Sequence, residues 1–382
     1  WEERSRMSNI PKLRFPEFKG EWEEKKLGEC LTLLYGKDWK DKSSTKKLYP
    51  VLGTGGVISY IDEFIYDKPC VLIGRKGSIN NPVFIDKPFW TVDTQFYSEI
   101  HEGYSPKFLY YIFCTENWSK HDESTGVPSL SAKNVENTHK HIPSYSEQQK
   151  IADFLSNVDS IITAETKILN TLQKKKKALM QKLFTRQLRF KSDDGKDFPA
   201  WEEKKLGDVC SYIGGGTPSK KVKEYWNGNI NWASVKDITG KYLYETQDKI
   251  SQLGADSSAT NICEPDSLLL ITRMSPGKTV ITKCITAINQ DLKIVKSYIN
   301  VEFLHLLFQS IQTKIDEKTS GTTVKGISIE GLNQIDIRLP CKAEQQKIAD
   351  CLSSMDSLIQ TQQKVVTTWQ QRKKALLQQM FI

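Results

Sequence analysis

Two aspartates and a lysine follow one another as they do in one class of nuclease. Pro265-Asp266 precedes Asp291-Leu292-Lys293, the order of a P-D…D-x-K set whose carboxylates hold a metal ion that activates water. The pattern is short and common. The pattern still leaves a freestanding metal-dependent DNA nuclease as an alternative function. Magnesium-dependent cutting of DNA by the purified chain would reveal it.

Other catalytic patterns in the chain are incomplete. Asn81-Pro82-Val83-Phe84 resembles the N-P-P-F box with which adenine methyltransferases hold a flipped base, but it lacks the second proline. No Gly-rich turn for S-adenosylmethionine precedes it. Gly277-Lys278-Thr279 ends like a phosphate-binding loop, but Thr272 stands where that loop needs glycine. We predict a non-catalytic chain with no metal and no cofactor of its own.

Side chains suited to DNA contact occur on or near Gly-rich turns. Phosphates accept hydrogen bonds from backbone N–H groups, hydroxyls and lysines, whereas Asn, Gln and Arg read base edges. In the first half of the chain the candidates are Lys37, Arg75, Lys76, Ser78, Asn80 and Gln95. In the second half they are Thr217, Ser219, Lys220, Lys221, Trp232, Lys236, Arg273, Lys278 and Gln290.

A duplicated stretch must position these groups. Residues 147–184 and 344–381 both begin with EQQKIAD, and about 21 of their 38 aligned positions are identical at a constant offset of 197. Such a duplication determines how the whole chain is organised. Neither copy contains Pro or Gly, and each follows a proline, Pro143 or Pro340. We predict two long helices, each a rod of roughly 57 Å.

Apolar residues in each copy follow alternating steps of three and four, which predicts a coiled-coil stripe. The two stripes include Ile151, Leu155, Val158, Ile162, Leu169 and Leu172, and Ile348, Leu352, Met355, Ile359, Val366 and Trp369. Each stripe is interrupted at matching places, by Glu165 and Gln362 and by Lys176 and Lys373. Two copies of one unit pair most simply about a twofold axis, so we predict antiparallel helices with Glu165 near Gln362. The lysines of 174–177 are interpreted as a solvated helix face or a docking surface for a partner.

The rest of the chain is also duplicated in outline. WEEKKLG occurs at residues 22–28 and again at 201–207, and each copy opens a variable region that ends at a long helix. Both variable regions mix strand-like runs with a late helical stretch but hardly align with each other. We predict one α+β fold used twice with different surfaces. Two divergent domains on one frame suit a bipartite, asymmetric target, and DNA is the obvious linear one.

The composition of the chain indicates its cellular compartment and the kinds of partner it can have. Eight scattered cysteines without C-x-x-C spacing predict reduced thiols and a cytoplasmic protein. No apolar run is long enough to span a membrane, and we expect no membrane partner. The net charge of +8 is compatible with a nucleic-acid partner without demonstrating one. A scaffold with two ligand-binding domains and no DNA contact is a second alternative.

The chain resembles the specificity subunit of type I restriction–modification enzymes. The resemblance rests on the twin E-Q-Q-K-I-A-D-x-L-S helices, the W-E-x-K-K-L-G starts, and G-G-T-P-S…Y-W-N-G-x-I-x-W in the second half. It covers nearly everything from about residue 11 onward. The first half departs from it, with Tyr35-Gly36-Lys37-Asp38-Trp39 in place of G-G-T-P-S.

The resemblance implies that each of two target-recognition domains reads one part of a split DNA sequence. It also implies that the paired helices dock two methyltransferase subunits that use S-adenosylmethionine, and that motor–nuclease subunits using ATP and Mg²⁺ join them. The expected order is a tag or disordered start at 1–10, a first recognition domain at 11–145, a central helix at 146–186, a second recognition domain at 187–342 and a C-terminal helix at 343–382.

Overall fold

The computed structural model describes residues 10–321 and 324–381. Most of the expected tag at 1–10 therefore lies outside the described residues. The chain forms two compact units: unit 1 comprises residues up to 168 together with 362 onward, and unit 2 comprises residues 169–361. The boundaries differ from the expected domains because they fall inside the two long helices, α4 (Tyr145–Phe184) and α10 (Lys342–Met380). Each unit thus contains one globular body and part of both helices.

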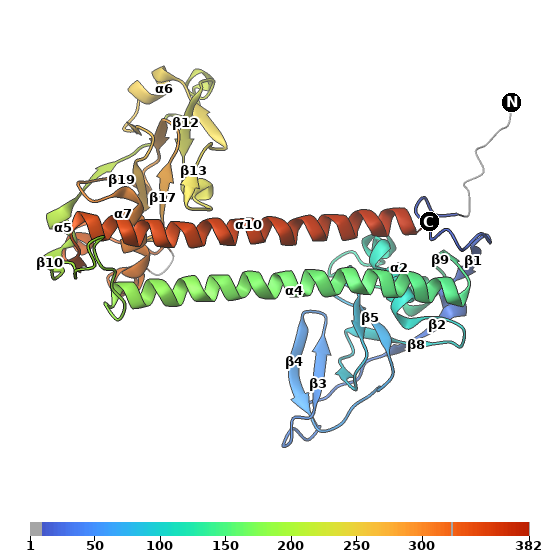
Figure 1. Ribbon diagram of the computed structural model, residues 1–382. Helices are drawn as coiled ribbons and strands as arrows, with labels where there is room; N and C mark the ends of the chain where they lie inside the picture. The colour runs from blue at the N-terminus through green and yellow to red at the C-terminus, as the bar shows by residue number, and fades with distance from the viewer. Residues whose placement is uncertain (1–9, 322–323, 382) are drawn as a thin grey trace. The chain divides into compact units, whose positions relative to one another are not determined.

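Unit 1 contains two small sheets and a two-stranded ribbon beside the helices (Figure 1). The larger sheet has the order β2 (Leu31–Tyr35), β8 (Gln95–Ile100), β5 (Cys70–Gly74), β6 (Val83–Ile85). The smaller sheet has the order β4 (Gly56–Ile61), β3 (Tyr49–Gly53), β7 (Trp90–Thr91), and the ribbon pairs β1 (Glu23–Lys26) with β9 (His139–Ile142). The shorter helices are α1 (Leu27–Cys30), α2 (Pro106–Thr115), η1 (Trp118–His121) and α3 (Ala132–Glu136).

Unit 2 repeats this plan with one extra strand in each sheet. Its first sheet has the order β11 (Cys210–Gly214), β19 (Leu292–Ser297), β16 (Leu268–Ile271), β17 (Thr279–Thr282), β13 (Tyr242–Leu243). Its second sheet has the order β14 (Asp248–Ile250), β12 (Ile230–Ala233), β18 (Thr286–Ile288), β15 (Asn261–Cys263), and the ribbon pairs β10 (Glu202–Lys205) with β20 (Asp336–Leu339). Its helices are α5 (Leu206–Val209), η2 (Lys223–Tyr225), η3 (Val235–Asp237), α6 (Gln252–Asp256), α7 (Val301–Ser310), α8 (Gln312–Glu317) and α9 (Ile329–Asn333). The expected α+β fold with an internal repeat is confirmed.

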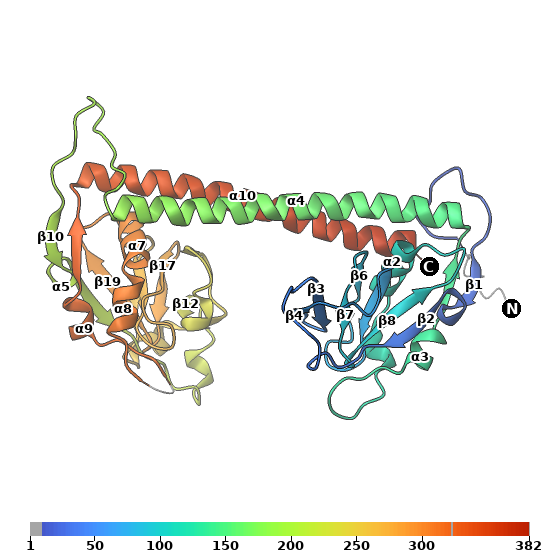
Figure 2. The same cartoon turned by 90° about the horizontal axis from the view of Figure 1, so that it is seen from below.

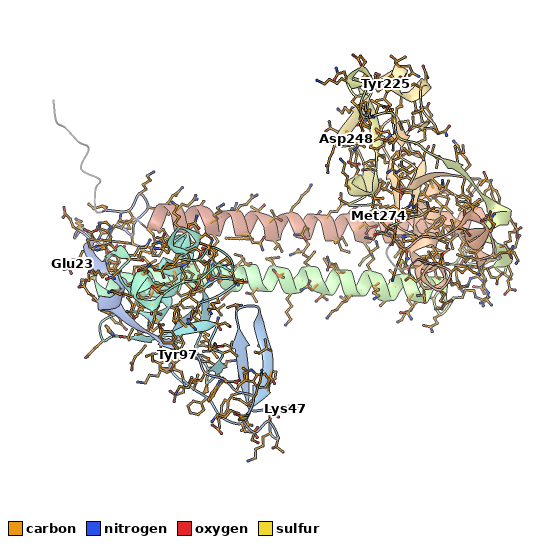
Figure 3. All side chains as sticks on the ribbon, turned by 180° about the vertical axis from the view of Figure 1, so that it is seen from behind. Glu23, Lys47, Tyr97, Tyr225, Asp248 and Met274 are labelled. Atoms are coloured by element: carbon orange, nitrogen blue, oxygen red, sulfur yellow. The ribbon has the colours of Figure 1, made fainter. Side chains whose placement is uncertain are left out.

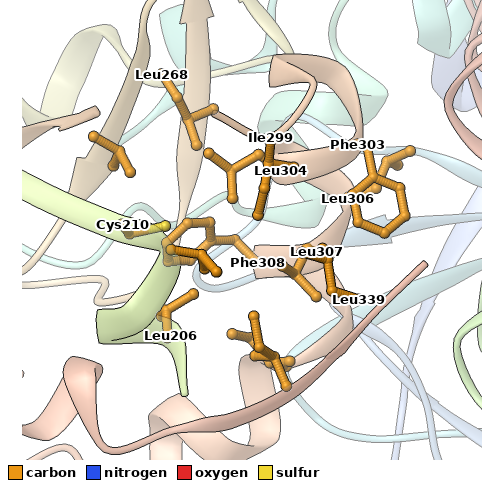
Figure 4. Packing of buried hydrophobic residues seen from close by; sticks show 14 of the residues in the cluster. Leu206, Cys210, Leu268, Ile299, Phe303, Leu304, Leu306, Leu307, Phe308 and Leu339 are labelled. Carbon is orange, nitrogen blue, oxygen red and sulfur yellow. The ribbon is translucent and has the colours of Figure 1, made fainter. Parts of the chain in front are cut away.

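The late helix of each variable region forms the centre of a core. In unit 2, α7 lies across one face of the β11–β19–β16–β17 sheet (Figure 2). Its apolar side chains Phe303, Leu307 and Phe308 are buried, and they pack among residues of α5, β16 and β20 (Figure 4). In unit 1, α2 has the same place, and its Phe108, Ile112 and Phe113 are buried. Asn300 and Ser105 cap these two helices, because the side chain of each accepts a hydrogen bond from the backbone N–H three residues further on.

The long helices run antiparallel within each unit, as predicted. In unit 1, Gln362 Nε2 donates to the Glu165 carboxylate at 2.5 Å, and Lys373 lies 2.6 Å from Asp159. In unit 2, Lys176 Nζ lies 2.5 Å from Asp356 Oδ1. The prediction for the lysine run was wrong at Lys176, because this side chain is paired with the facing helix while Lys174, Lys175 and Lys177 are exposed.

The residues in these polar contacts are related by the internal repeat. Residues 159 and 356 are 197 apart, and so are 176 and 373, so the two lysine–aspartate pairs are the same pair made once by each copy. Glu165 and Gln362 are likewise 197 apart and contact each other. Every predicted stripe residue is buried or half-buried. However, Ile151 and Leu155, like Ile348 and Leu352, join the core of a globular body, so the start of each helix is also a docking face.

The first two residues of the duplicated EQQ form a buried polar clamp at the start of each long helix. Glu147 is 1% exposed and accepts two hydrogen bonds of 2.7 Å from the Arg14 guanidinium and one from Trp22 Nε1. Gln148 accepts from the backbone N–H of Ser105 and donates to the carbonyl of Pro143. The clamp therefore joins the arm before β1, the cap of α2 and the first turn of α4.

The second copy makes the same clamp. Glu344 is fully buried and accepts hydrogen bonds from Arg189 Nε at 3.0 Å, Arg189 Nη2 at 2.7 Å and Trp201 Nε1 at 3.0 Å. Gln345 accepts from the backbone N–H of Asn300 and donates to the carbonyl of Pro340. Each unit therefore fixes its globular body to a long helix by the same pairing of a buried carboxylate with a partly buried arginine.

Glu147→Ala should lower the free energy of unfolding of unit 1 by about 3–5 kcal/mol, because it leaves the Arg14 guanidinium buried without its partner. Urea unfolding of the full chain, followed by hydrogen exchange at peptides of α2, measures this loss. Glu21→Ala, an exposed change in the same segment, is the control and should change the unfolding free energy by less than about 0.5 kcal/mol. Equal effects of the two variants would contradict the clamp.

A buried histidine makes the stability of unit 2 sensitive to acid. His305 on α7 is 3% exposed, and its Nδ1 and Nε2 lie within hydrogen-bonding distance of Thr279 Oγ1 and Gln309 Nε2. Burial, followed by the nearby positive charges of Lys241 and Lys176, lowers the pKa of His305 to about 4. The Glu302 and Asp356 carboxylates oppose this shift but are outweighed.

The unfolded chain therefore binds a proton at this histidine more readily than the folded chain does. The contribution of His305 to stability is fully present above about pH 6.5 and is lost as the pH falls toward 4, by at most about 3 kcal/mol. His305→Gln should flatten the decline in unfolding free energy between pH 6.5 and 4. His139→Gln, at an exposed histidine of β9, should leave it unchanged. A decline of equal slope in both variants would assign the acid sensitivity to carboxylates instead.

Candidate nucleic-acid interface

A glycine-lined turn leaves the edge strand β11 in unit 2. The backbone N–H of Gly216 donates to the carbonyl of Ile288 at 3.0 Å. A Cβ on Gly215 would lie 2.3 Å from the Ile288 carbonyl oxygen, so no larger residue fits there. The indole Nε1 of Trp232 donates to the Gly216 carbonyl at 3.1 Å. These contacts hold the turn against the second sheet and present Thr217 to solvent.

Four side chains from three loops form a hydrogen-bonded row at this end of the first sheet. Thr217 Oγ1 donates to Gln290 Oε1 at 2.6 Å, Gln290 Nε2 lies 3.5 Å from Asp291 Oδ2, and Arg273 Nη1 lies 3.4 Å from Asp291 Oδ1. We call Thr217, Arg273, Gln290 and Asp291 the unit 2 row. The structure thus brings together three of the residues predicted to contact DNA. A hydroxyl, an amide and a guanidinium side by side can donate to phosphates and to base edges.

The equivalent place in unit 1 is built from other side chains. Gly36 N–H donates to the Gln95 carbonyl, Lys37 N–H to the Thr91 carbonyl, and Trp90 Nε1 to the Lys37 carbonyl at 2.9 Å. The Arg75 guanidinium lies 5.3 Å from the Tyr35 ring centroid. We call Tyr35, Lys37 and Arg75 the unit 1 row.

The indole contact shows how the two turns correspond. Trp90 lies on β7, which pairs with β3, whereas Trp232 lies on β12, which pairs with β18. Both pairings are parallel, so β3 corresponds to β12 and β7 to β18. The tryptophan has therefore moved to the other strand of the pair, yet it donates to the same carbonyl position after the edge strand.

Two predicted contact residues are buried and leave the candidate set. Gln95 is 2% exposed and accepts a hydrogen bond from Thr91 Oγ1 at 2.8 Å inside unit 1. Trp232 is 5% exposed, and its indole N–H donates to the Gly216 carbonyl of the turn. A side chain without exposed surface has nothing to offer a duplex in this conformation. Asn80 is exposed, but its Oδ1 accepts a hydrogen bond from the Trp118 backbone N–H at 2.8 Å. This side chain therefore has a structural role.

The remaining candidates are exposed but do not all lie together. Lys76 and Ser78 follow Arg75 on the loop after β5, and Lys278 lies on the equivalent loop after β16. Ser219, Lys220 and Lys221 follow the glycine turn, and Lys236 is paired with Asp248 at 2.7 Å. In the view of Figure 3, Asp248 and Tyr225 lie at the end of unit 2 away from α10, whereas Met274 lies closer to that helix. The predicted set in unit 2 is therefore spread over two places.

Sequence reasoning missed Tyr35, Asp291 and Met274 as parts of this surface. Tyr35 is 53% exposed beneath Arg75, and its ring lies 5.0 Å from that of Phe96. Asp291 was considered only as part of a nuclease pattern. Met274 directly follows Arg273 and is 62% exposed, which is unusual for a methionine. The sequence did contain a clue to Tyr35. Tyr35-Gly36 stands where the second half has Gly214-Gly215, so Tyr35 takes the place of a glycine at the end of the edge strand.

The nuclease pattern does not converge in the structure. The backbone N–H of Asp266 bonds to Thr282 at one end of β16, while Thr272, just beyond the other end, donates to the Asp291 carbonyl. The length of β16 therefore lies between the two aspartates, which are placed at opposite ends of this strand. Asp266 pairs with Lys283 and Asp291 with Arg273. Within residues 10–321 and 324–381, no group of three His, Cys, Asp or Glu residues is arranged to hold a metal ion.

Two mixed sheets beside a pair of long helices occur twice within this chain. The sequence profile described as Type I restriction modification DNA specificity domain matches residues 19–174 and 200–368. The chain belongs to this family, which confirms the resemblance seen in the sequence. No helix in the described part of the chain is both long and apolar enough to cross a membrane.

Individual relatives agree with this assignment. The MjaIX specificity subunit of Methanocaldococcus jannaschii is 32% identical over 180 residues, 45% of this chain and 42% of that protein. The match thus spans less than half of that relative. The MjaVIII specificity subunit of the same organism is 25% identical over 96% of this chain and 92% of its own length. The crystal structure of the type I system S subunit from M. genitalium shares the fold, with a TM-score of 0.64, 15% identity and coverage of 98% and 99% of the two chains.

Trp232→Phe should free the glycine turn, because it removes the indole N–H that binds the Gly216 carbonyl while keeping an aromatic ring. The expected loss is about 1–2 kcal/mol of local stability. Hydrogen–deuterium exchange should accelerate roughly tenfold at Gly216, whose backbone N–H is hydrogen-bonded in this turn. Trp118→Phe, which removes a buried indole donor from unit 1, is the control and should not change exchange at the turn. Unchanged exchange in the Trp232 variant would show that backbone contacts alone hold the turn.

Proposed function

We propose that this chain is the DNA-reading subunit of a type I restriction–modification complex, and that each unit contacts one half of a bipartite, asymmetric target. The observation that carries the proposal is the pair of equivalent turns with different side chains. The unit 1 row offers an aromatic ring, a lysine and an arginine, whereas the unit 2 row offers a hydroxyl, an amide and an arginine. Different donors at one place in one fold suit two different half-sites.

The two rows are also suited to duplex DNA in their electrostatics. Arg75, Lys76 and Lys37 in unit 1 and Arg273 and Lys278 in unit 2 lie on loops at equivalent ends of the first sheet. Asp291 holds the Arg273 guanidinium in place while leaving it more than half exposed. A preoriented guanidinium loses less freedom when it binds a base or phosphate.

The long helices supply surfaces for partner subunits. In unit 1, a groove of about 440 Å³ between α4 and α10 is lined by apolar side chains, among them Phe154, Ile161, Trp369 and Leu376. In this proposal two methyltransferase subunits that use S-adenosylmethionine dock on the helices, and motor–nuclease subunits that use ATP and Mg²⁺ join them. The chain itself holds no cofactor and carries out no chemistry. It acts in the cytoplasm, where all eight of its cysteines stay reduced.

Arg273→Ala should change base preference in only one half of the recognised sequence, at a cost of about 1–3 kcal/mol in discrimination. The measurement is methylation-sensitive sequencing of DNA from cells that express the variant with its partner subunits. Arg338→Ala removes an exposed, ion-paired arginine from β20 of the same unit and should leave the recognised sequence unchanged.

Exchange of residues 29–143 for those of another family member gives the complementary test. It should alter only the half-site that Arg273→Ala leaves intact. A change in both halves would refute one half-site per unit. A chain with its partners that retained no duplex at low salt would favour the alternative of a scaffold with two ligand-binding domains.

A further inference from the structure

Met274 is an exposed apolar residue held in a backbone conformation that methionine rarely adopts. It follows β16 with φ at 70°, and 62% of the residue is accessible to solvent. Bulky residues avoid this left-handed region because Cβ crowds the backbone, and such outliers gather at functional sites. An exposed methionine also gains nothing from burial that could offset the strain. The position therefore has a backbone cost that burial of the side chain does little to offset in the free protein.

The equivalent residue in unit 1 is a glycine. Lys76 and Arg273 form matching bridges to Ser129 and Gly326, so the residues that follow them, Gly77 and Met274, occupy the same place. Gly77 also has a positive φ, of 84°. The turn thus requires the left-handed conformation in both units, and glycine satisfies it without strain. Unit 2 has a large apolar side chain there instead.

Backbone hydrogen bonds hold this turn in place. The N–H of Met274 donates to the carbonyl of Lys325 at 2.8 Å, just as the N–H of Gly77 donates to that of Pro128 at 2.9 Å. The N–H of Ser275 donates to the Arg273 carbonyl at 2.9 Å. The methionine is consequently presented to solvent from a backbone that is already fixed.

The residues around Met274 suit contact with a DNA duplex better than packing inside a protein core. Arg273 precedes it and belongs to the unit 2 row, and Lys278 lies exposed on the same loop. An apolar tip flanked by cations and hydrogen-bond donors fits a ligand whose apolar faces are stacked between phosphates. DNA has this chemistry, and proteins kink it by inserting Phe, Leu, Ile, Met or Pro between base pairs.

We propose that Met274 enters the base stack of the half-site contacted by the unit 2 row and unstacks one base step. The proposal rests on the proposed function and adds a DNA distortion to it. Because unit 1 has Gly77 at the same place, the distortion occurs in only one half-site. Unstacking next to a recognition surface lowers the energy needed to extrude a nearby base.

The test uses the full chain with its partner subunits and duplexes that the wild-type complex selects from a random pool. Permanganate modifies unstacked thymines and diethyl pyrocarbonate modifies unstacked purines, so together they report every base step. The wild-type complex should raise reactivity severalfold at one step in one half-site. Met274→Gly should abolish that signal and weaken binding roughly tenfold.

Two further variants separate insertion from other roles. Met274→Leu should keep both the signal and the affinity, since leucine can also serve as a wedge. Ile285→Ala, an exposed apolar change elsewhere in unit 2, should leave both unchanged. Met274→Gly relieves the strained turn, so its melting temperature should equal or exceed that of the wild type. Lost reactivity would then not arise from unfolding.

Several results would overturn the wedge. Reactivity that persists in Met274→Gly, or weaker binding with an unchanged reactivity pattern, would mean that Met274 touches only the outside of the duplex. Loss of a partner subunit from the complex would assign Met274 to a protein interface. If the wild-type complex selects no duplex, the proposed function fails and the wedge fails with it.

Discussion

Each unit depends on a carboxylate buried at the start of a long helix. Glu147 and Glu344 have almost no exposed surface, and each is neutralised by a two-pronged arginine contact and an indole N–H. A buried charge is tolerated only when such partners surround it, so helix, arm and sheet ribbon must be assembled together. This requirement explains why EQQ recurs where the variable regions have diverged. The residues of the globular body can vary as long as the arginine and indole contacts to the buried carboxylate are kept.

The helices add a second constraint that is polar as well. Leucine-like stripes alone allow several registers, whereas Glu165 with Gln362 and Lys176 with Asp356 are satisfied in only one. Because the lysine–aspartate contact is generated twice by the offset of 197, the repeat defines its own antiparallel partner. Stability and register therefore come from different residues on the same helices.

The frame and the reading surface follow different rules. Frame residues such as Gly36 and Gly215 are dictated by close backbone approach, since added Cβ atoms would meet carbonyl oxygens at 2.0 and 2.3 Å. The residues beside them, Lys37 and Thr217, face solvent and are free to vary. The family assignment therefore rests on the frame. The proposed half-site preferences and the proposed wedge depend on the variable positions.

Local patterns were most informative where one residue type at one spacing has one structural outcome. The three-and-four stripe without Pro or Gly predicted both long helices to within a few residues, and the offset of the repeat predicted the contact between Glu165 and Gln362. Predictions of single contact residues were weaker. Gln95 lies only two residues after the exposed Asp93, yet it begins β8, whose first four residues are all buried.

By itself the sequence determined the duplication, the fold class, the family and the polar positions of the helix pair, because these follow from periodicity and repetition along the chain. Only the tertiary structure decided which side chains meet. It joined Thr217, Gln290 and Arg273 from three loops, and it separated Asp266 from Asp291 by the length of β16. Contacts between distant residues depend on strand order and on which face of a sheet a side chain occupies, and spacing along the chain encodes neither.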